Sequence, residues 1–430
     1  MVYVSTVHML HAAGLFAVLV LTPLTGTRPV RAESAHNSLP NAAETQVVQD
    51  QIWFGPNFGS VDVLDLFTSP EQWATARSHI QVFALAMTQV ATGGWSCTGL
   101  PHVNCGENHL QNLVDVDAFA MLESWDIDLA LDSFFAGPIA SVDPIVCASG
   151  EEVFNLTLDG TANVINNVQA NGGTVRYFAM DEPIRQWYPE YFYLVSGQTD
   201  PRPCLVESLD ILADHVADYI LFMQDALPSL SIGQIALYPE VGVATLMEWV
   251  LALEERGVAL PFLQIDVHGP RVAQYISYGF DIDVERDLIE LKSFLSEHNV
   301  ALGVFVTDIN WDAQVWEEDE YDDAMYVSRT MEWVNQLRPL AQHIDQFLFQ
   351  SWVYPVYTTG NGPNEIPTNL PDDNVALSTH TRLITTAVPI LQGETSVPST
   401  STWGMIAMSL LVVTFATLIL GRSPALVTGS

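Results

Sequence analysis

The chain has 430 residues, of which 49% are hydrophobic and 15% are charged, so it can bury a large core as one barrel or as two ordinary domains. Its formal net charge is −37 and Lys292 is its only lysine, so its surface repels nucleic acid and anionic lipid. We therefore expect no nucleic-acid partner, and a neutral substrate rather than a phosphorylated one.

The first 32 residues, 1–32, predict a signal peptide. Residues 12–21 form a short apolar core, and residues 30–32, Val-Arg-Ala, fit a small-residue cleavage site. Two histidines are the only side chains near the start that could be positive before this core, so a membrane anchor is the alternative. Residues 33–50 are polar, lack an apolar period and predict a linker. We therefore expect an exported protein that is periplasmic, displayed on the cell surface or secreted.

Eight apolar runs predict eight strands that alternate with helices. Strands are expected at residues 52–55, 80–87, 128–135, 175–183, 233–240, 261–268, 301–308 and 346–353. Helices are expected at residues 69–78, 110–123, 160–169, 204–226, 243–256, 284–298, 323–337 and 376–391. The strands are continuous apolar runs, as parallel strands covered by helices are, and no glycine-rich phosphate loop follows the first of them. Residues 51–392 are therefore predicted to form an α/β fold, a (β/α)8 TIM-like barrel that is the catalytic domain.

Acidic side chains stand at the ends of four consecutive strands. In chain order, these ends carry Asp181 and Glu182, then Glu240, then Asp266 and His268, then Asp308 and Asn310. In a barrel the carboxyl ends of the strands meet at one mouth. Carboxylates brought together repel one another, and this repulsion raises the pKa of at least one of them, as a general acid at neutral pH requires.

Aromatic residues are frequent near the same strand ends. Trp53 lies in the first strand, and Trp187 and Trp352 lie near the ends of the fourth and eighth strands. Aromatic faces with polar edges suit the C–H faces of sugars, and carboxylates without lysines or phosphate loops favour carbohydrate. We therefore expect a carbohydrate substrate bound by Asp181, Asp266, His268, Trp53, Trp187, Asn310 and Trp352.

The fourth strand ends in Asp181-Glu182-Pro183, and this DEP ending resembles the NEP ending of strand 4 in the large clan of retaining glycoside hydrolases. That resemblance implies a TIM barrel in which Glu182 is the general acid/base and Trp352 is the platform under the sugar. The chain departs from the clan's pattern at two places. Asp181 replaces the asparagine that contacts the sugar 2-hydroxyl, and the seventh strand ends in Asp308 instead of the nucleophilic glutamate.

The expected function is cleavage of glycosidic bonds by two carboxyl groups, without a metal or a cofactor. Glu182 would protonate the glycosidic oxygen, and Asp308, or else Glu240, would attack the anomeric carbon or activate water. One alternative is a metal-dependent sugar isomerase or hydrolase that uses these acids and His268 as ligands. Another is a non-catalytic surface protein that binds glycans. In a purely structural interpretation, Glu182 pairs with Arg185.

Four cysteines, Cys97, Cys105, Cys147 and Cys204, are expected to form disulfides, because export permits them. Three pairings are possible. We favour Cys97–Cys105, which closes a short loop, together with Cys147–Cys204, which brackets the fourth strand. A zinc site is the alternative, but no ligand spacing typical of zinc supports it.

The C-terminal segment predicts a membrane anchor or sorting signal. Residues 393–402 form a Ser/Thr/Pro spacer and residues 403–430 a hydrophobic tail. The run 397–408, VPSTSTWGMIAM, resembles the IPTL-type sorting segments of Gram-negative bacteria, which are related to PEP-type exosortase signals. The basic cluster of such segments is here reduced to Arg422. We therefore expect the tail to contact the cell-envelope membrane.

Overall fold

The computed structural model describes residues 51–57, 60, 62–90, 109–134, 161–187, 208–310, 322–351, 367–373 and 378–394, all of which belong to one unit of the chain, residues 46–430. The predicted signal peptide, linker and hydrophobic tail lie outside these residues, as do most of the spacer, the four cysteines and Trp352. Within the described ranges, no helix is long and apolar enough to cross a membrane.

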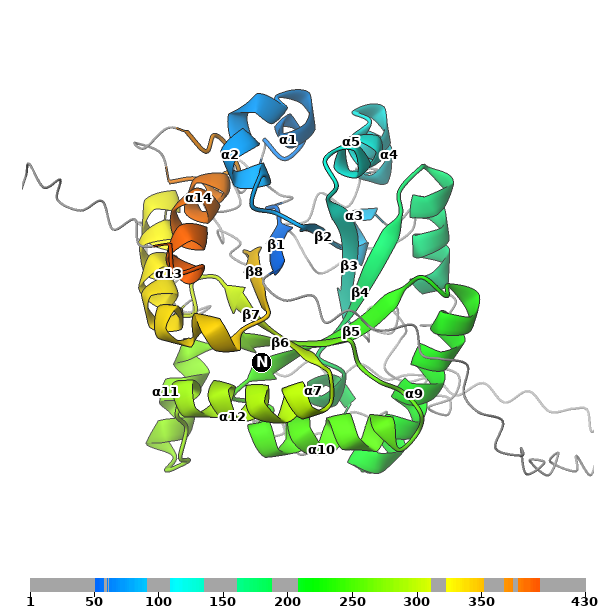
Figure 1. Cartoon of the computed structure of the whole chain (residues 1–430), viewed down its shortest axis with the longest axis vertical. Coiled ribbons are helices and arrows are strands. Elements are labelled where there is room, and N and C mark those ends of the chain that lie inside the picture. The colour runs from blue at the N-terminus through cyan, green and yellow to red at the C-terminus, as the bar shows by residue number, and fades with distance from the viewer. Residues whose placement is uncertain are drawn as a thin grey trace, which may run out of the picture. The chain divides into compact units, whose positions relative to one another are not determined.

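Eight parallel strands close into a barrel, because each strand pairs with the next one along the chain and β8 pairs with β1 (Figure 1). The strands are β1 (Gln51–Gly55), β2 (Val82–Ala86), β3 (Asp128–Phe134), β4 (Val175–Asp181), β5 (Ser231–Tyr238), β6 (Phe262–Val267), β7 (Ala301–Val306) and β8 (Gln346–Gln350). Each of them overlaps the apolar run from which it was predicted. The predicted (β/α)8 TIM barrel is therefore confirmed.

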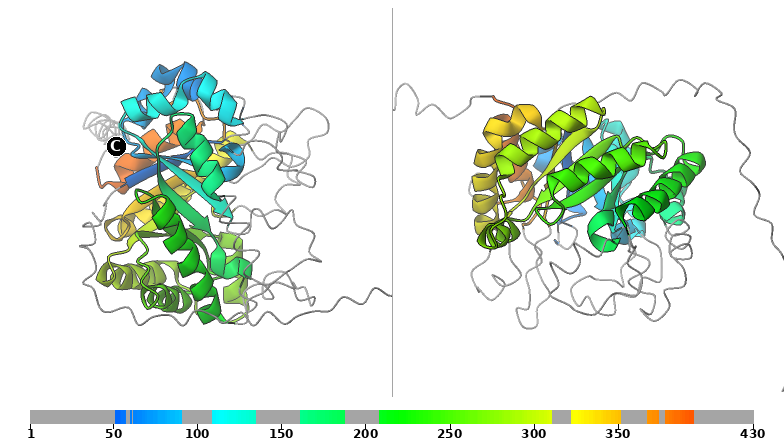
Figure 2. Two further views of the ribbon diagram at one scale, coloured as in Figure 1. Left: turned by 90° about the vertical axis from the view of Figure 1, so that its right-hand side faces the viewer. Right: turned by 90° about the horizontal axis from the view of Figure 1, so that it is seen from below.

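Helices surround the strands on the outside of the barrel (Figures 1 and 2). They are α1 (Asp65–Thr68), η1 (Pro70–Trp73), α2 (Ala74–Arg77), α3 (Met87–Val90), α4 (His109–Asp115), α5 (Ala118–Ser124), α7 (Pro183–Trp187), α9 (Leu209–Ala226), α10 (Val243–Glu254), α11 (Gly269–Ser277), α12 (Val284–Glu297), α13 (Asp323–Leu337), η3 (Arg338–His343) and α14 (His380–Leu391). Residues 161–170 are also helical.

The helices α1, α3, α7, α11 and η3 were not predicted, and one predicted helix is broken in two. The helix expected at residues 110–123 is broken into α4 and α5 by Asp117, whose φ of 54° lies in the left-handed region and cannot continue a right-handed helix. The helix α11 was not predicted. Its residue before the first turn, His268, accepts a hydrogen bond at Nδ1 from the backbone N of Arg271 (3.3 Å), and Pro270 lies in the first turn.

Apolar side chains fill both sides of the strands. The larger cluster lies between the strands and the helices, and a smaller one fills the barrel interior. In that interior the ring of Trp53 lies 5.1 Å from the ring of Tyr177 and 5.4 Å from that of Phe262, and its Nε1 donates a 3.1 Å hydrogen bond to Gln51. The interior is thus a packed core, which leaves the mouth as the place for a site.

Gly233 on β5 makes room for Phe262 in this core. A Cβ atom at position 233 would lie 2.4 Å from the Phe262 ring. We expect Gly233→Ala to lower the free energy of unfolding by about 2 to 3 kcal/mol, because the ring must leave its position in a well-packed interior. Chemical denaturation measures this change. Gly242→Ala is the control, because its Cβ meets nothing within 4 Å, and it should cost less than about 1 kcal/mol.

Candidate active site

Three aspartates and one glutamine face the barrel interior near the carboxyl ends of their strands. Side chains an even number of positions apart on a strand point to the same face. Ala130 and Ala179 of the interior core precede Asp132 and Asp181 by two positions, and the interior Phe262 precedes Asp266 by four. Gln350 at the end of β8 donates a 3.1 Å hydrogen bond from Nε2 to Asp132 Oδ2. Three carboxyl groups from β3, β4 and β6 therefore converge at one end of the barrel.

These carboxyl groups hold their protons more tightly than aspartates in water. Burial, and next the negative charge of Glu182, raises the pKa of Asp266 to about 7. Burial raises the pKa of Asp132 to about 6, although the hydrogen bond from Gln350 opposes the change. Burial and the neighbouring Glu182, Asp132 and Asp266 raise the pKa of Asp181 well above its ordinary value. The mouth therefore holds protonated acids at a pH at which exposed aspartates are ionised.

Arg185 joins the glutamates of β4 and β5. Glu182 follows β4 with a left-handed φ of 51°, and three residues later, on α7, Arg185 forms ion pairs with both Glu182 and Glu240. Arg271 on α11 adds a second ion pair to Glu240, at 3.2 Å. Glu240 is 1% exposed and Glu182 7%. The structural pairing of Glu182 with Arg185 is thus present, and it lies beside the inward aspartates rather than away from them.

Asp308 lies on the other side of its strand. Its carboxylate accepts a 3.0 Å hydrogen bond from the backbone N of Asn310 and lies 3.7 Å from Arg329 on α13. The interior side chain of β7 is Phe305, three positions earlier, so alternation turns Asp308 toward the helices. The structure therefore places the expected partner of Glu182 outside the group of inward aspartates.

The remaining predicted binding residues lie in different surroundings. His268 is partly buried and caps α11. Asn310 is exposed and lies next to Gly269, since a Cβ atom added at position 269 would be 2.7 Å from Asn310 Oδ1. Trp53 is 1% exposed inside the barrel, so it is not a platform that a sugar can reach. Trp187 ends α7, and its side chain, like Trp352, lies outside the described part of the structure.

Four site residues were not predicted: Asp132, Gln350, Arg185 as a bridge between two glutamates, and Arg271. Asp132 could have been recognised, because a lone charge inside the apolar run of β3 is costly unless it faces a polar site. The sequence could not assign the two arginines to the site in this way. Arg271, for example, contacts Glu240 because it lies on α11, a helix that was not predicted. Within the described residues, no group of three or more His, Cys, Asp or Glu side chains is arranged to hold a metal ion.

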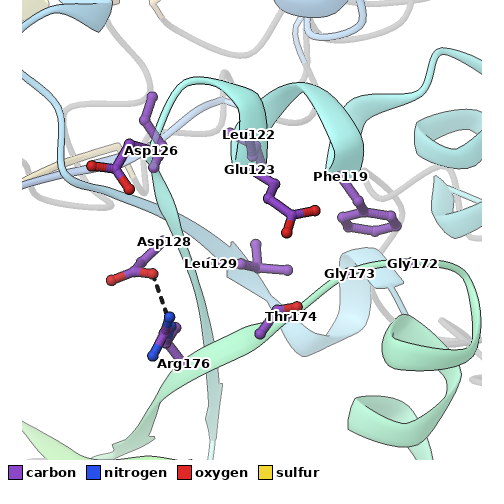
Figure 3. A pocket seen from close by; sticks show the side chains of 11 residues that line it. Phe119, Leu122, Glu123, Asp126, Asp128, Leu129, Gly172, Gly173, Thr174 and Arg176 are labelled. Atoms are coloured by element: carbon purple, nitrogen blue, oxygen red, sulfur yellow. Dashed lines mark ion pairs between the residues drawn. The ribbon is translucent and has the colours of Figure 1, made fainter.

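A separate pocket of about 230 Å³ opens at the other ends of β3 and β4, away from the mouth (Figure 3). Its lining includes the ion pair between Asp128 and Arg176, 3.1 Å, together with Glu123 and Phe119 of α5. The chemistry of TIM barrels takes place at the opposite end, where the strands end. We therefore assign the candidate site to the mouth.

No protein-family model matches the chain, and no curated protein matches it in sequence. Solved structures are similar to it at low identity. The GH53 catalytic domain of Ignisphaera aggregans is 11% identical, with a TM-score of 0.46 over 82% of this chain and 97% of that one. A thermostable xylanase mutant from Cellvibrio japonicus is 10% identical, with a TM-score of 0.46 over 80% and 98%. An aldo/keto reductase from Brucella melitensis is 12% identical, with a TM-score of 0.34 over 69% and 82%.

Proposed function

We propose that the chain hydrolyses glycosidic bonds of a neutral carbohydrate in the mouth of its barrel. The observation that supports this function best is the convergence of Asp132, Asp181 and Asp266 beside the ion-paired Glu182. Glycoside hydrolysis needs one protonated and one ionised carboxyl group on either side of the scissile bond. The mouth offers both kinds, and the DEP ending of β4 resembles the strand that carries the acid/base in such enzymes.

In this proposal Asp266 is the proton donor and Glu182 is the anion. Asp266 transfers its proton to the glycosidic oxygen as the bond from that oxygen to the anomeric carbon breaks. In one route the Glu182 carboxylate attacks the anomeric carbon and forms a glycosyl ester, which water then hydrolyses while Asp266 takes up the proton of the water. In the other route Glu182 removes a proton from the water molecule that attacks the anomeric carbon directly. These roles differ from those that the clan resemblance implies, since Asp266 is partly exposed and protonated near neutral pH, whereas Glu182 is ion-paired with Arg185.

The expected substrate is neutral. The only two cationic groups among the mouth residues described above, Arg185 and Arg271, are both engaged by Glu240, and Arg185 also by Glu182. No cation of this set is left to bind a phosphate or a carboxylate of the substrate. The signal peptide and the C-terminal tail, which rest on sequence alone, would place this activity outside the cytoplasm and hold it at the cell envelope.

A second candidate is glycan binding without turnover. It is favoured by the ion pairs of Glu182 and Glu240 with Arg185, because a carboxylate neutralised by a guanidinium is a weaker nucleophile and base. In this case the mouth would bind sugar hydroxyls with its polar side chains and leave the glycosidic bond intact.

The test is an assay of the purified protein on neutral oligosaccharides and polysaccharides with different linkages. The wild type is expected to release new reducing ends from at least one of them, and the double variant Glu182→Gln/Asp266→Asn from none. If the wild type binds a glycan in titration calorimetry but releases no product, the binding function holds. If cleavage persists in the double variant, the two carboxyl groups are not the catalytic pair.

A further inference from the structure

A run of exposed aromatic and apolar residues lies at the end of α11, which begins two residues after the end of β6 at the mouth. In the described residues eight large apolar side chains are exposed, and three of them fall within residues 276–280: Ile276 at 51%, Tyr278 at 65% and Phe280 at 48%. The others are spread over α9, α10 and α12. A local concentration of this kind on a strand-to-helix connection of a barrel marks a surface for a ligand.

A ladder of polar contacts connects this surface to the candidate site. Arg271, which is ion-paired with Glu240, donates a 2.8 Å hydrogen bond to Gln274, and Gln274 donates a 2.9 Å hydrogen bond to the Tyr278 hydroxyl. The spacing of three and four residues places all three side chains on one face of α11. At the rise of an α-helix, this face extends about 10 Å from the mouth, a length comparable to that of a disaccharide.

The aromatic rings of this surface are held in place. Gly279, with φ of +89°, ends the helix, and the backbone N of Phe280 donates to the carbonyl of Tyr275 at 3.1 Å. The Phe280 ring lies 5.2 Å from the buried Tyr275 ring, and the Tyr278 ring is oriented by Gln274. An exposed ring that is already ordered binds a ligand at a smaller cost in conformational entropy.

We propose that Tyr278 and Gln274 form an outer subsite that binds a neutral sugar unit of a glycan chain leaving the mouth. This inference rests on the proposed glycan substrate. A neutral chain fits because the ring offers an apolar face and Gln274 an amide beside it, without a free charge. A second copy of the chain fits less well, since a stable dimer buries about 800 Å² on each partner and two copies of charge −37 repel each other.

The test compares substrates of different length in Tyr278→Ala. On long neutral oligosaccharides its KM should rise about fivefold to tenfold, the value of one aromatic contact, with kcat unchanged. On an aryl monosaccharide glycoside, which is too short to reach Tyr278 from the mouth, both constants should stay at the wild-type values. Tyr278→Phe keeps the ring, so its KM on long oligosaccharides should stay close to the wild-type value. Phe222→Ala on α9 is the matched control, because the Phe222 ring is 47% exposed, and it should leave KM and kcat unchanged on both substrates.

Three results would overturn the subsite: no change in KM with length, an equal loss on the aryl glycoside, or a shift in oligomeric mass on sedimentation of Tyr278→Ala. The inference can be separated from the proposed hydrolysis. If the wild type cleaves nothing, the same variants are titrated with long neutral oligosaccharides, and a fivefold to tenfold weaker Kd of Tyr278→Ala supports the subsite while hydrolysis fails. If the wild type binds none of them, the subsite is wrong.

Discussion

Asp266→Asn is expected to lower kcat/KM on a cleaved glycan by about 10²- to 10⁴-fold, the usual contribution of a general acid, and at the same time to stabilise the protein at pH 8. The proposed donor acts only while it is protonated. Because the pKa of Asp266 is about 7, wild-type kcat/KM should fall as the pH rises through 7. The variant has no proton to lose at this position and should lack that decline. A pH profile of both proteins measures the difference.

Asp266→Asn lowers the activity but is expected to raise the free energy of unfolding. The pKa of Asp266 is about 7 in the folded chain and near 3.8 in the unfolded chain, so folding is favoured by the extra proton at low pH, and this contribution is lost as the pH rises from about 4 to 7. The shift of the pKa from 3.8 to about 7 corresponds to about 4 kcal/mol of folding free energy. We expect roughly half of this value, because Asp266 keeps some contact with solvent, which screens its charge. Asn removes the ionised form, so the variant should gain about 2 kcal/mol at pH 8 and little at pH 4.

Asp218→Asn is the matched control, since Asp218 is exposed on α9, and it should change the free energy of unfolding by less than about 0.5 kcal/mol at either pH. Retention of more than a tenth of the wild-type kcat/KM by Asp266→Asn at pH 6 would exclude it as the donor. A gain in stability without loss of activity would mean that Asp266 is only a buried acid.

Arg185→Met is expected to lower the free energy of unfolding by about 3 kcal/mol at pH 8, the lower end of the cost of leaving buried charges unpaired. The side chain of Arg185 is 29% exposed, and it is paired with Glu182 and Glu240, which are nearly inaccessible. Without it, the repulsion between these carboxylates and the inward aspartates is no longer offset. At pH 5 the loss in stability should shrink, because Glu240 and Asp266, whose pKa values are raised by burial, can take up protons instead. Urea denaturation at both pH values measures it.

Two variants distinguish charge from packing at this position. Arg176→Met removes a pair with Asp128 whose side chains are 57% and 39% exposed, and it should cost less than about 1 kcal/mol. Arg185→Lys keeps the charge but loses the planar fork that reaches two carboxylates, so its loss should be intermediate. An equal loss for Arg185→Met at pH 5 and pH 8 would show that the side chain acts by packing alone.

The sequence predicted the barrel because its strands and helices carry strong local signals. Apolar runs of strand length alternate with amphipathic segments, and α13, expected at residues 323–337, has those bounds in the structure. Local signals failed where one residue or one cap decides the geometry. The left-handed Asp117 breaks one helix, and α11 begins after a histidine, which is not among the residues that usually cap a helix.

The sequence predicted acids at the strand ends, and Asp181, Glu182, Glu240 and Asp266 are among the residues of the candidate site, but it did not predict the full set. The sequence shows that acidic residues stand at the ends of β4, β5, β6 and β7. It does not show which way each side chain points, because that depends on the alternation of side chains along the strand. A shift of one residue moves a side chain from the interior to the helix side. For this reason Asp308 faces α13, Trp53 fills the core, and Asp132, in the middle of an apolar run, belongs to the site.

The position of Arg185 also bears on the order in which the mouth assembles. Its pair with Glu182 spans three residues, so it can form within a single turn of chain, whereas its pair with Glu240 closes a loop of more than fifty residues. Loop closure costs more entropy as the loop grows, and local contacts therefore form first. The guanidinium is then already in place when β5 docks on β4, and Glu240 enters the barrel wall opposite a positive charge rather than against a bare carboxylate.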